Sequence, residues 1–255
     1  MTQNFSDRIT RDLQSLGVRE GGVLLVHSSL RSLGLPADLP ASGRGEIIVQ
    51  GLLQALGPAG TLLLPALSYE TVGAHQPLFD ARSTPACIGA LPEFFRCRPG
   101  TLRSIHPTHS VCGVGARAEA LLADHIHSTT PVGPHSPFAR LPEVGGQVLF
   151  LGSGLRPNTS MHGVEELVEP EYLYGPEVDY RVIQADGAER AMRVRSHNFK
   201  GWEQRYDRLE DVMERGLRKG NVLAADCFLL EASEMWDAAL SVLRKDPLYF
   251  VDRSE

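Results

Sequence analysis

The apolar runs Val23-Leu24-Leu25-Val26 and Thr61-Leu62-Leu63-Leu64 decide the fold, because each predicts a buried strand. A helix is predicted before each run. The first covers residues 6–16, where apolar side chains recur at helical spacing and Gly17 ends the pattern, and the second covers residues 45–56. The first third of the chain therefore alternates helix, strand, helix, strand. That order favours an α/β fold built in layers.

Shorter elements are predicted along the rest of the chain. Residues 68–92 lack periodicity and are rich in Gly, Pro and Ser, which indicates a long loop of the kind that is often functional. Further predictions are a short helix over 116–122, a turn-rich loop over 128–137, a hairpin over 182–194 around Asp186-Gly187, a helical stripe of Leu209, Val212, Met213 and Leu217, and a helix over 231–243. No internal repeat or linker is visible, so a single domain over residues 1–255 is predicted.

Composition narrows the functional classes. Of the 255 residues, 42% are hydrophobic and 22% are charged, enough for a buried core. The net charge of −6 lacks the basic excess typical of nucleic-acid-binding proteins. No apolar run approaches the roughly 18 residues that span a bilayer, and the first seven residues do not resemble a signal peptide. The four cysteines have no C-x-x-C spacing and predict reduced thiols. We expect a cytoplasmic protein that binds neither nucleic acid nor membrane.

His162 and Glu165 are the strongest candidates for catalysis. They follow the apolar run 148–151, where a strand is predicted to lead into a helix. A spacing of three residues puts both side chains on one helix face, and a carboxylate that holds an imidazole in one tautomer makes a general base. The same segment is equally typical of a helix start, with Thr159 or Ser160 as the N-cap and acidic residues beside the helix dipole.

Two hydroxyl-rich segments that each carry an arginine are candidate phosphate sites. The segment His27-Ser28-Ser29-Leu30-Arg31 follows a predicted strand, where hydroxyls, backbone N–H groups and an arginine suit a phosphate. A polar turn is the competing interpretation. The segment 103–110 carries a second arginine together with His106 and His109, which could instead be metal ligands. Pro107 opposes a helical pairing of these two histidines, and no carboxylate lies nearby in the sequence.

Three weaker patterns each allow two interpretations. Gly113-Val114-Gly115-Ala116-Arg117-Ala118 imitates a dinucleotide fingerprint, but no acidic residue follows about twenty positions on, so a glycine-permitted turn is expected. Residues 157–180 carry acidic side chains without Lys or Arg, which indicates a solvated face or a field that attracts an amine. Arg190, Arg193 and Arg195 alternate along a predicted strand and form either an exposed hairpin face or a contact for an anionic acceptor.

The combination and order of these motifs over roughly residues 6–250 resembles the aminoglycoside 3-N-acetyltransferase family, whose fold is unrelated to that of the GNAT acetyltransferases. The matching stretches are 25–34, 56–65, 103–107, 136–141 and 146–162, and the tail 236–247 resembles the family's closing helix. The resemblance implies an α/β fold with a layered mixed β-sheet and flanking helices. It also implies acetyl-CoA-dependent acetylation of a primary amine on an aminoglycoside or similar amino sugar, and hence antibiotic resistance.

The resemblance also implies roles for individual residues. His162 is the implied general base and Glu165 the acid that orients it. The implied contacts to CoA are His27, Ser28, Ser29, Leu30, Arg31, Arg103, Ser104, Ser110 and Phe138, and the implied contacts to the amine substrate are Tyr69, Glu70, Glu171 and Asp179. Acetyl-CoA is the expected cosubstrate, no metal is expected, and a homodimer is one possible assembly.

One departure from the family pattern concerns the acceptor. The family usually reads Met-Pro-Thr where this chain has Leu64-Pro65-Ala66, so a threonine hydroxyl near the family's reaction centre is missing. Ser68 is a candidate replacement. The departure leaves open a biosynthetic amine, such as a nucleotide-linked amino sugar, as the acceptor. The sequence also leaves open a non-catalytic CoA-binding protein and a metal hydrolase that uses His106, His109, His125 or His127.

Overall fold

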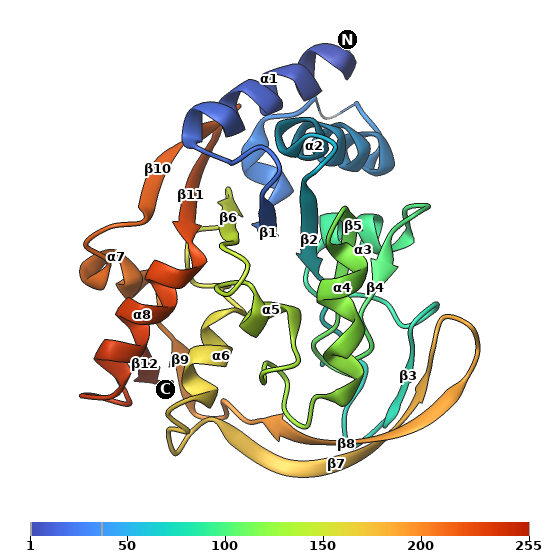
Figure 1. Ribbon diagram of the computed structural model, residues 1–255, viewed down its shortest axis with the longest axis vertical. Helices are drawn as coiled ribbons and strands as arrows, with labels where there is room; N and C mark the ends of the chain where they lie inside the picture. Colours follow the sequence, from blue (N-terminus) through green and yellow to red (C-terminus); the bar gives the residue numbers. More distant parts are fainter. Residues whose placement is uncertain (1, 37, 255) are drawn as a thin grey trace.

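A seven-stranded mixed sheet forms the centre of the computed structural model, which describes residues 2–36 and 38–254 (Figure 1). The strand order is β10-β11-β6-β1-β2-β5-β4, and its three middle strands β6 (Gln147–Leu151), β1 (Val23–Ser28) and β2 (Thr61–Pro65) are parallel. The outer strands, each antiparallel to its neighbour, are β10 (Leu217–Val222), β11 (Ala225–Glu231), β5 (Val111–Gly115) and β4 (Leu102–Arg103). The apolar runs form the parallel centre because both of their faces are buried.

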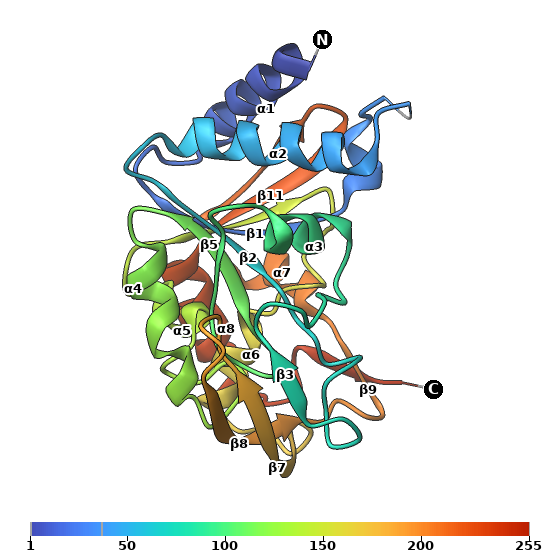
Figure 2. The same ribbon diagram turned by 90° about the vertical axis from the view of Figure 1, so that its right-hand side faces the viewer.

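Helices cover both faces of this sheet (Figure 2). Alternate residues of β1 point to opposite sides, so Leu24 and Val26 join one core cluster whereas Val23 and Leu25 join another. The first cluster packs against α1 (Thr2–Leu16), α2 (Ala41–Leu56) and α3 (Ala90–Cys97). The second packs against α4 (Ala118–Leu122), α5 (Pro137–Arg140), α6 (Met161–Glu166), α7 (Leu209–Val212) and α8 (Ala232–Leu243). The 3₁₀ turns are η1 (Leu30–Leu33), η2 (Ala123–His127) and η3 (Tyr206–Arg208).

The contact between α1 and α2 depends on a glycine. Ile9 and Leu13 of α1 are fully buried, as their helical spacing predicts. Gly51 faces Ile9 from the interior of α2, and a Cβ at this position would lie 2.6 Å from Ile9 Cγ2. The missing side chain therefore lets the two helices approach closely enough to cover the sheet together.

A second, three-stranded sheet curves beneath the main one (Figures 1 and 2). It has the order β3-β7-β8 and consists of β3 (Leu78–Asp80), β7 (Tyr174–Ile183) and β8 (Glu189–His197). Burial alternates along β7, where Val178, Tyr180 and Val182 point inward. A short pair, β9 (Trp202–Gln204) and β12 (Val251–Arg253), lies near the C-terminus.

The layered α/β fold with a mixed sheet is confirmed, and so is the hairpin around Asp186-Gly187, which is longer than predicted. The predicted helical stripe is wrong at Leu217, which begins strand β10, because α7 ends at Val212. Of the turn expected over residues 113–118, residues 113–115 instead form the end of strand β5, whose last residue Gly115 has φ of +121°, and Ala116 and Arg117 form a turn before α4. No helix within 2–36 and 38–254 is both long and apolar enough to cross a membrane.

Candidate active site

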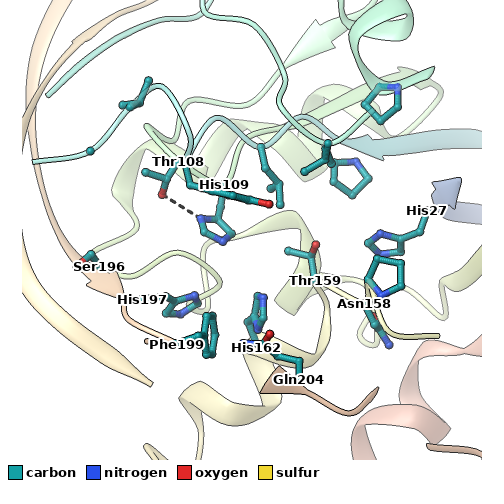
Figure 3. Close-up of a pocket in the computed structure, with 18 of the residues that line it drawn as sticks. His27, Thr108, His109, Asn158, Thr159, His162, Ser196, His197, Phe199 and Gln204 are labelled. Carbon is teal, nitrogen blue, oxygen red and sulfur yellow. Dashed lines mark hydrogen bonds between the residues drawn. The ribbon is translucent and has the colours of Figure 1, made fainter. Parts of the chain in front are cut away.

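A cavity of about 620 Å³ lies at the carboxyl ends of the three parallel strands (Figure 3). Residues 26–28 of β1, Pro65 of β2 and residues 156–159 after β6 form one wall. The second sheet contributes Val178 and His197, among others, to the opposite wall. Open α/β sheets bind ligands at this edge, because the loops that leave parallel strands converge there. The cavity is therefore the candidate active site.

His162 projects into this cavity from the first turn of α6, and its Nδ1 lies 3.0 Å from Oε2 of Glu165 (Figure 3). The predicted shared helix face is thus present. Ser160 occupies the N-cap position without a side-chain capping bond, so the capping role considered for it from the sequence is wrong. Its hydroxyl instead accepts a hydrogen bond from Trp236 Nε1 at 3.1 Å.

Two tyrosines hold the Glu165 carboxylate, which is fully buried. Tyr172 donates its hydroxyl to Oε1 at 2.8 Å and Tyr206 donates to Oε2 at 2.9 Å. Burial and the neighbouring Glu165 charge raise the pKa of both phenols, so both keep their protons and remain donors. Since a carboxylate only accepts hydrogen bonds, His162 Nδ1 carries a proton, and the lone pair at Nε2 is left for the cavity.

A second histidine–glutamate pair lies directly beside the first. His197 Nε2 is 2.8 Å from Glu166 Oε1, and the His162 and His197 rings are 5.1 Å apart. His109 completes the group, with its ring 5.3 Å from that of His197 (Figure 3). Burial lowers the pKa of His109 and His197 well below that of a free imidazole, and neighbouring imidazoles add to the effect. Both rings are therefore neutral at pH 7.

His27 and Ser28 line another part of the same cavity. The His27 ring stacks on Phe150 at 5.1 Å, and burial lowers its pKa to about 3, with a further contribution from His162. His27 Nε2 and Ser28 Oγ are buried polar atoms without a hydrogen-bond partner among the described residues. Such atoms at a cavity wall suit a ligand that offers amide or carbonyl groups.

Of the second predicted phosphate segment, Thr108 and His109 line the cavity, whereas Arg103, Ser104 and Ser110 lie outside the lining. Arg103 donates to Ser110 Oγ and to the carbonyl oxygens of Ala66 and Thr84, and burial lowers its pKa to about 10. Ser104 bonds to His125 and to the Val111 backbone. Ser110 also donates to Ala66, and Phe138 is a core residue. The structure therefore gives Arg103, Ser104, Ser110 and Phe138 internal partners, because the chain folds back around them.

The other predicted CoA residues lie next to the cavity or at the surface. Ser29, Leu30 and Arg31 follow the cavity-lining end of β1 without lining the cavity themselves, and Arg31 is exposed. Arg156, which sequence reasoning missed, lines the cavity with its side chain 52% exposed and ion pairs with Glu203 at 2.6 Å. Among the described residues that line the cavity, Arg156 is the one that carries a permanent charge.

Of the four predicted substrate contacts, the structure brings one to the cavity. Tyr69 lines it and is 49% exposed. Glu70, Glu171 and Asp179 are exposed and lie outside the lining; Glu171 approaches Arg253 at 4.0 Å and Asp179 approaches Arg193 at 3.5 Å. Arg193 and its neighbours form an exposed face of the hairpin. Ser68 does not offer its hydroxyl to the cavity, because it donates to the Pro107 carbonyl at 2.6 Å.

Comparison with known proteins places this geometry in a family. The family described as aminoglycoside 3-N-acetyltransferase matches residues 25–244. The chain belongs to the aminoglycoside 3-N-acetyltransferase family. Aminoglycoside N(3)-acetyltransferase VII from Streptomyces paromomycinus is 33% identical, with 90% of this chain and 88% of that protein covered. The protein is therefore an acyltransferase.

Solved structures of aminoglycoside acetyltransferases share the fold. A histidine-to-alanine variant of AAC(3)-IVa in complex with a gentamicin matches with a TM-score of 0.79 and 30% identity, covering 96% of this chain and 90% of that one. AAC-IIIb in a binary complex with CoASH matches with a TM-score of 0.79 and 27% identity, covering 98% of each chain. The implied aminoglycoside 3-N-acetyltransferase fold is thus confirmed.

Sequence reasoning missed most of the side chains that surround His162. Tyr206, Tyr172 and His197 come from other elements, and no local pattern links them to the His162 motif. The adjacent acids Glu165 and Glu166 were the available signal of a second histidine–glutamate pair. Neighbouring residues on a helix point in different directions, so each carboxylate can bind a different histidine.

Proposed function

We propose that this enzyme transfers the acetyl group of acetyl-CoA to a primary amine of an aminoglycoside or similar amino sugar, with His162 as the general base and Glu165 as its orienting acid. The observation that carries the proposal is the His162 ring in the cavity, held at Nδ1 by the buried Glu165 carboxylate. The names of the related acetyltransferases and the complexes of two of them with gentamicin and with CoASH support the substrate classes.

The chemistry follows from the protonation states. An alkyl amine is mostly protonated at neutral pH, so it must lose a proton before it can attack a carbonyl. The Nε2 lone pair of His162 accepts that proton, and the Glu165 carboxylate stabilises the imidazolium that results. Tyr172 and Tyr206 keep the carboxylate in place. When bound, acetyl-CoA supplies the thioester carbonyl that the amine attacks. The C–S bond breaks as the amide bond forms, the His162 imidazolium returns its proton to the leaving CoA thiolate, and the second proton of the nitrogen passes to solvent.

Two polar atoms of the cavity wall suit the pantetheine arm of CoA, and two arginines on or near the wall suit its phosphate groups. The unpaired Ser28 Oγ and His27 Nε2 can bond to the amide groups of the pantetheine arm. Arg156 at the wall and the exposed Arg31 nearby are the cations available for phosphate groups. Arg103 is not assigned to this role, because its guanidinium is bonded within the protein.

Thiol release from acetyl-CoA tests the proposal. The purified enzyme is assayed with gentamicin, sisomicin and apramycin beside glucosamine and a nucleotide-linked amino sugar. Rapid release that depends on an aminoglycoside, with an acetylated product by mass spectrometry, is the expected result. Amine-independent release, or none with any amine, would contradict acetyl transfer to this substrate class.

A second acceptor class is favoured by the absence of a carboxylate among the described residues that line the cavity. Aminoglycosides carry several positive charges, whereas imidazoles and apolar side chains form most of this wall. This second candidate is an N-acyltransferase for a less cationic biosynthetic amine, such as a nucleotide-linked amino sugar. A higher kcat/KM for the nucleotide-linked sugar than for gentamicin in the same panel would select it.

A further inference from the structure

Three histidines from distant parts of the chain converge at one point of the cavity. His109 lies between β4 and β5, His162 on α6 and His197 at the end of β8. One ring nitrogen from each lies within 4.8 Å of the others. Figure 3 shows the three rings gathered around a common space, apart from His27. The proposed acetyl transfer uses one of these imidazoles and gives no reason for the other two.

The outer nitrogen of each ring is held by an oxygen. His109 Nδ1 lies 2.9 Å from Thr108 Oγ1, His162 Nδ1 lies 3.0 Å from Glu165 and His197 Nε2 lies 2.8 Å from Glu166. Each remaining nitrogen can therefore present a lone pair inward. Histidine ligands of metal ions have this arrangement, in which an oxygen acceptor fixes the tautomer and the opposite nitrogen binds the metal.

The inward nitrogen of His197 adds an independent sign of a ligand. The side chain of His197 is only 4% exposed, and its Nδ1 is buried without a hydrogen-bond partner among the described residues. A buried polar atom in this state is costly unless something binds it. The His109 and His162 rings belong to the same three-histidine group and are T-shaped, with ring centroids 6.1 Å apart.

The spacing suits zinc after a small adjustment. Three points separated by at most 4.8 Å lie within about 2.8 Å of a common centre, whereas a zinc–imidazole bond is roughly 2.0–2.1 Å. Each nitrogen must therefore move inward by less than about 1 Å. Three imidazole nitrogens with one open position suit Zn²⁺ and not Mg²⁺, which prefers oxygen ligands. Glu165 and Glu166, directly behind two of the rings, offset the charge of the ion.

We propose that His109, His162 and His197 form a Zn²⁺ site and that zinc bound there reversibly inhibits the enzyme. The ion takes the Nε2 lone pair of His162, so this imidazole can no longer accept the proton of the amine. The inhibition rests on the proposed function, whereas zinc binding does not. Mg²⁺ leaves both the site and the enzyme's rate unchanged.

Zinc affinity is measured on the metal-stripped protein of 255 residues by competition with a chromophoric chelator. We expect one equivalent of Zn²⁺ to bind. His109→Ala and His197→Gln should each lose more affinity than the roughly 10- to 100-fold that loss of an outer-shell partner costs. Thr108→Val, which removes such a partner, should fall within that range. Cobalt added in place of zinc should give the visible absorption of four-coordinate Co²⁺, and His197→Asn serves if His197→Gln does not fold.

His127→Ala is the matched control, because exposed His127 lies near His135 with ring centroids 6.3 Å apart and offers a competing surface pair. It should bind zinc like the parent protein. No stoichiometric binding, or equal affinity in all the cavity variants, would overturn the proposal. Zinc should also abolish thiol release, and a chelator should restore it. Zinc binding by a protein that acetylates no amine would sustain the site and refute the proposed function, so the two failures are distinguishable.

Discussion

Glu165→Gln is the substitution that isolates the acid from the base. The side chain keeps its shape, but the carboxylate that accepts hydrogen bonds from Tyr172, Tyr206 and His162 becomes a neutral amide. The lost charge no longer stabilises the His162 imidazolium. A hydrogen bond to a charged group contributes about 1.5–3 kcal/mol, which corresponds to a decrease in kcat of roughly 10- to 150-fold.

The orientation of the new amide group determines how large the decrease in kcat can become. If the amide NH₂ faces His162, the imidazole must accept at Nδ1 and carry its proton at Nε2, and it is then no base. The comparable Asp-to-Asn change in chymotrypsin-type proteases lowers kcat about 10⁴-fold.

The assay is steady-state thiol release with saturating acetyl-CoA, and thermal unfolding verifies that the variant is folded. Glu171→Gln is the control, because this exposed carboxylate lies outside the cavity lining and should leave kcat unchanged. A folded Glu165→Gln enzyme with kcat within twofold of the parent would refute the assigned role of Glu165.

Three further predictions concern stability. Arg103→Met should lower the free energy of unfolding by about 3 kcal/mol in chemical denaturation, because buried carbonyl oxygens lose their donor. The KM for acetyl-CoA should stay within twofold of the parent value. A raised KM at unchanged stability would instead support a role of Arg103 in binding the phosphate groups of CoA. Burial lowers the pKa of His27 and His125 to about 3, so only the unfolded state takes up these protons as the pH falls below about 6.5, and stability is lost. Each histidine should lower the free energy of unfolding by about 1.3 kcal/mol between pH 7.5 and 5.5, as measured by urea titrations. In the His125→Gln variant this decrease should be smaller by the contribution of one histidine. The same pH dependence in the variant and the parent would contradict this prediction. Gly51→Ala should lower the free energy of unfolding by about 1 kcal/mol through overpacking. Gly43→Ala should not lower it, because no atom lies closer than 3.4 Å to the added carbon. Equal stability of the two variants would refute the close contact between α1 and α2.

The parallel centre of the fold was predictable because its signal is local. The apolar runs of β1, β2 and β6 identify strands buried on both faces, whatever lies beside them. The outer strands carry no such signal. Leu217 continues a helical spacing from Leu209, yet it begins a strand, because the sheet edge formed by β11 gives its backbone hydrogen-bond partners.

The pairing of His162 with Glu165 was predictable because both residues lie on one helix. His162 and Glu165 meet because helix geometry joins positions three apart. Tyr206 and His197 reach the same place through the packing of η3 and β8, which no local pattern reveals. Arg103 shows the converse, since a sequence cannot indicate whether an arginine faces solvent or is enclosed by carbonyl oxygens of its own chain.

The central claim is that His162 removes the proton of the amine, and the kcat of His162→Ala tests it most directly. General-base catalysis contributes roughly 10²- to 10⁴-fold, so kcat for thiol release with the preferred amine should fall by that factor. The Kd for acetyl-CoA, measured by calorimetry, should stay within about twofold. A folded His162→Ala enzyme that acetylates its amine at the parent rate would contradict the claim.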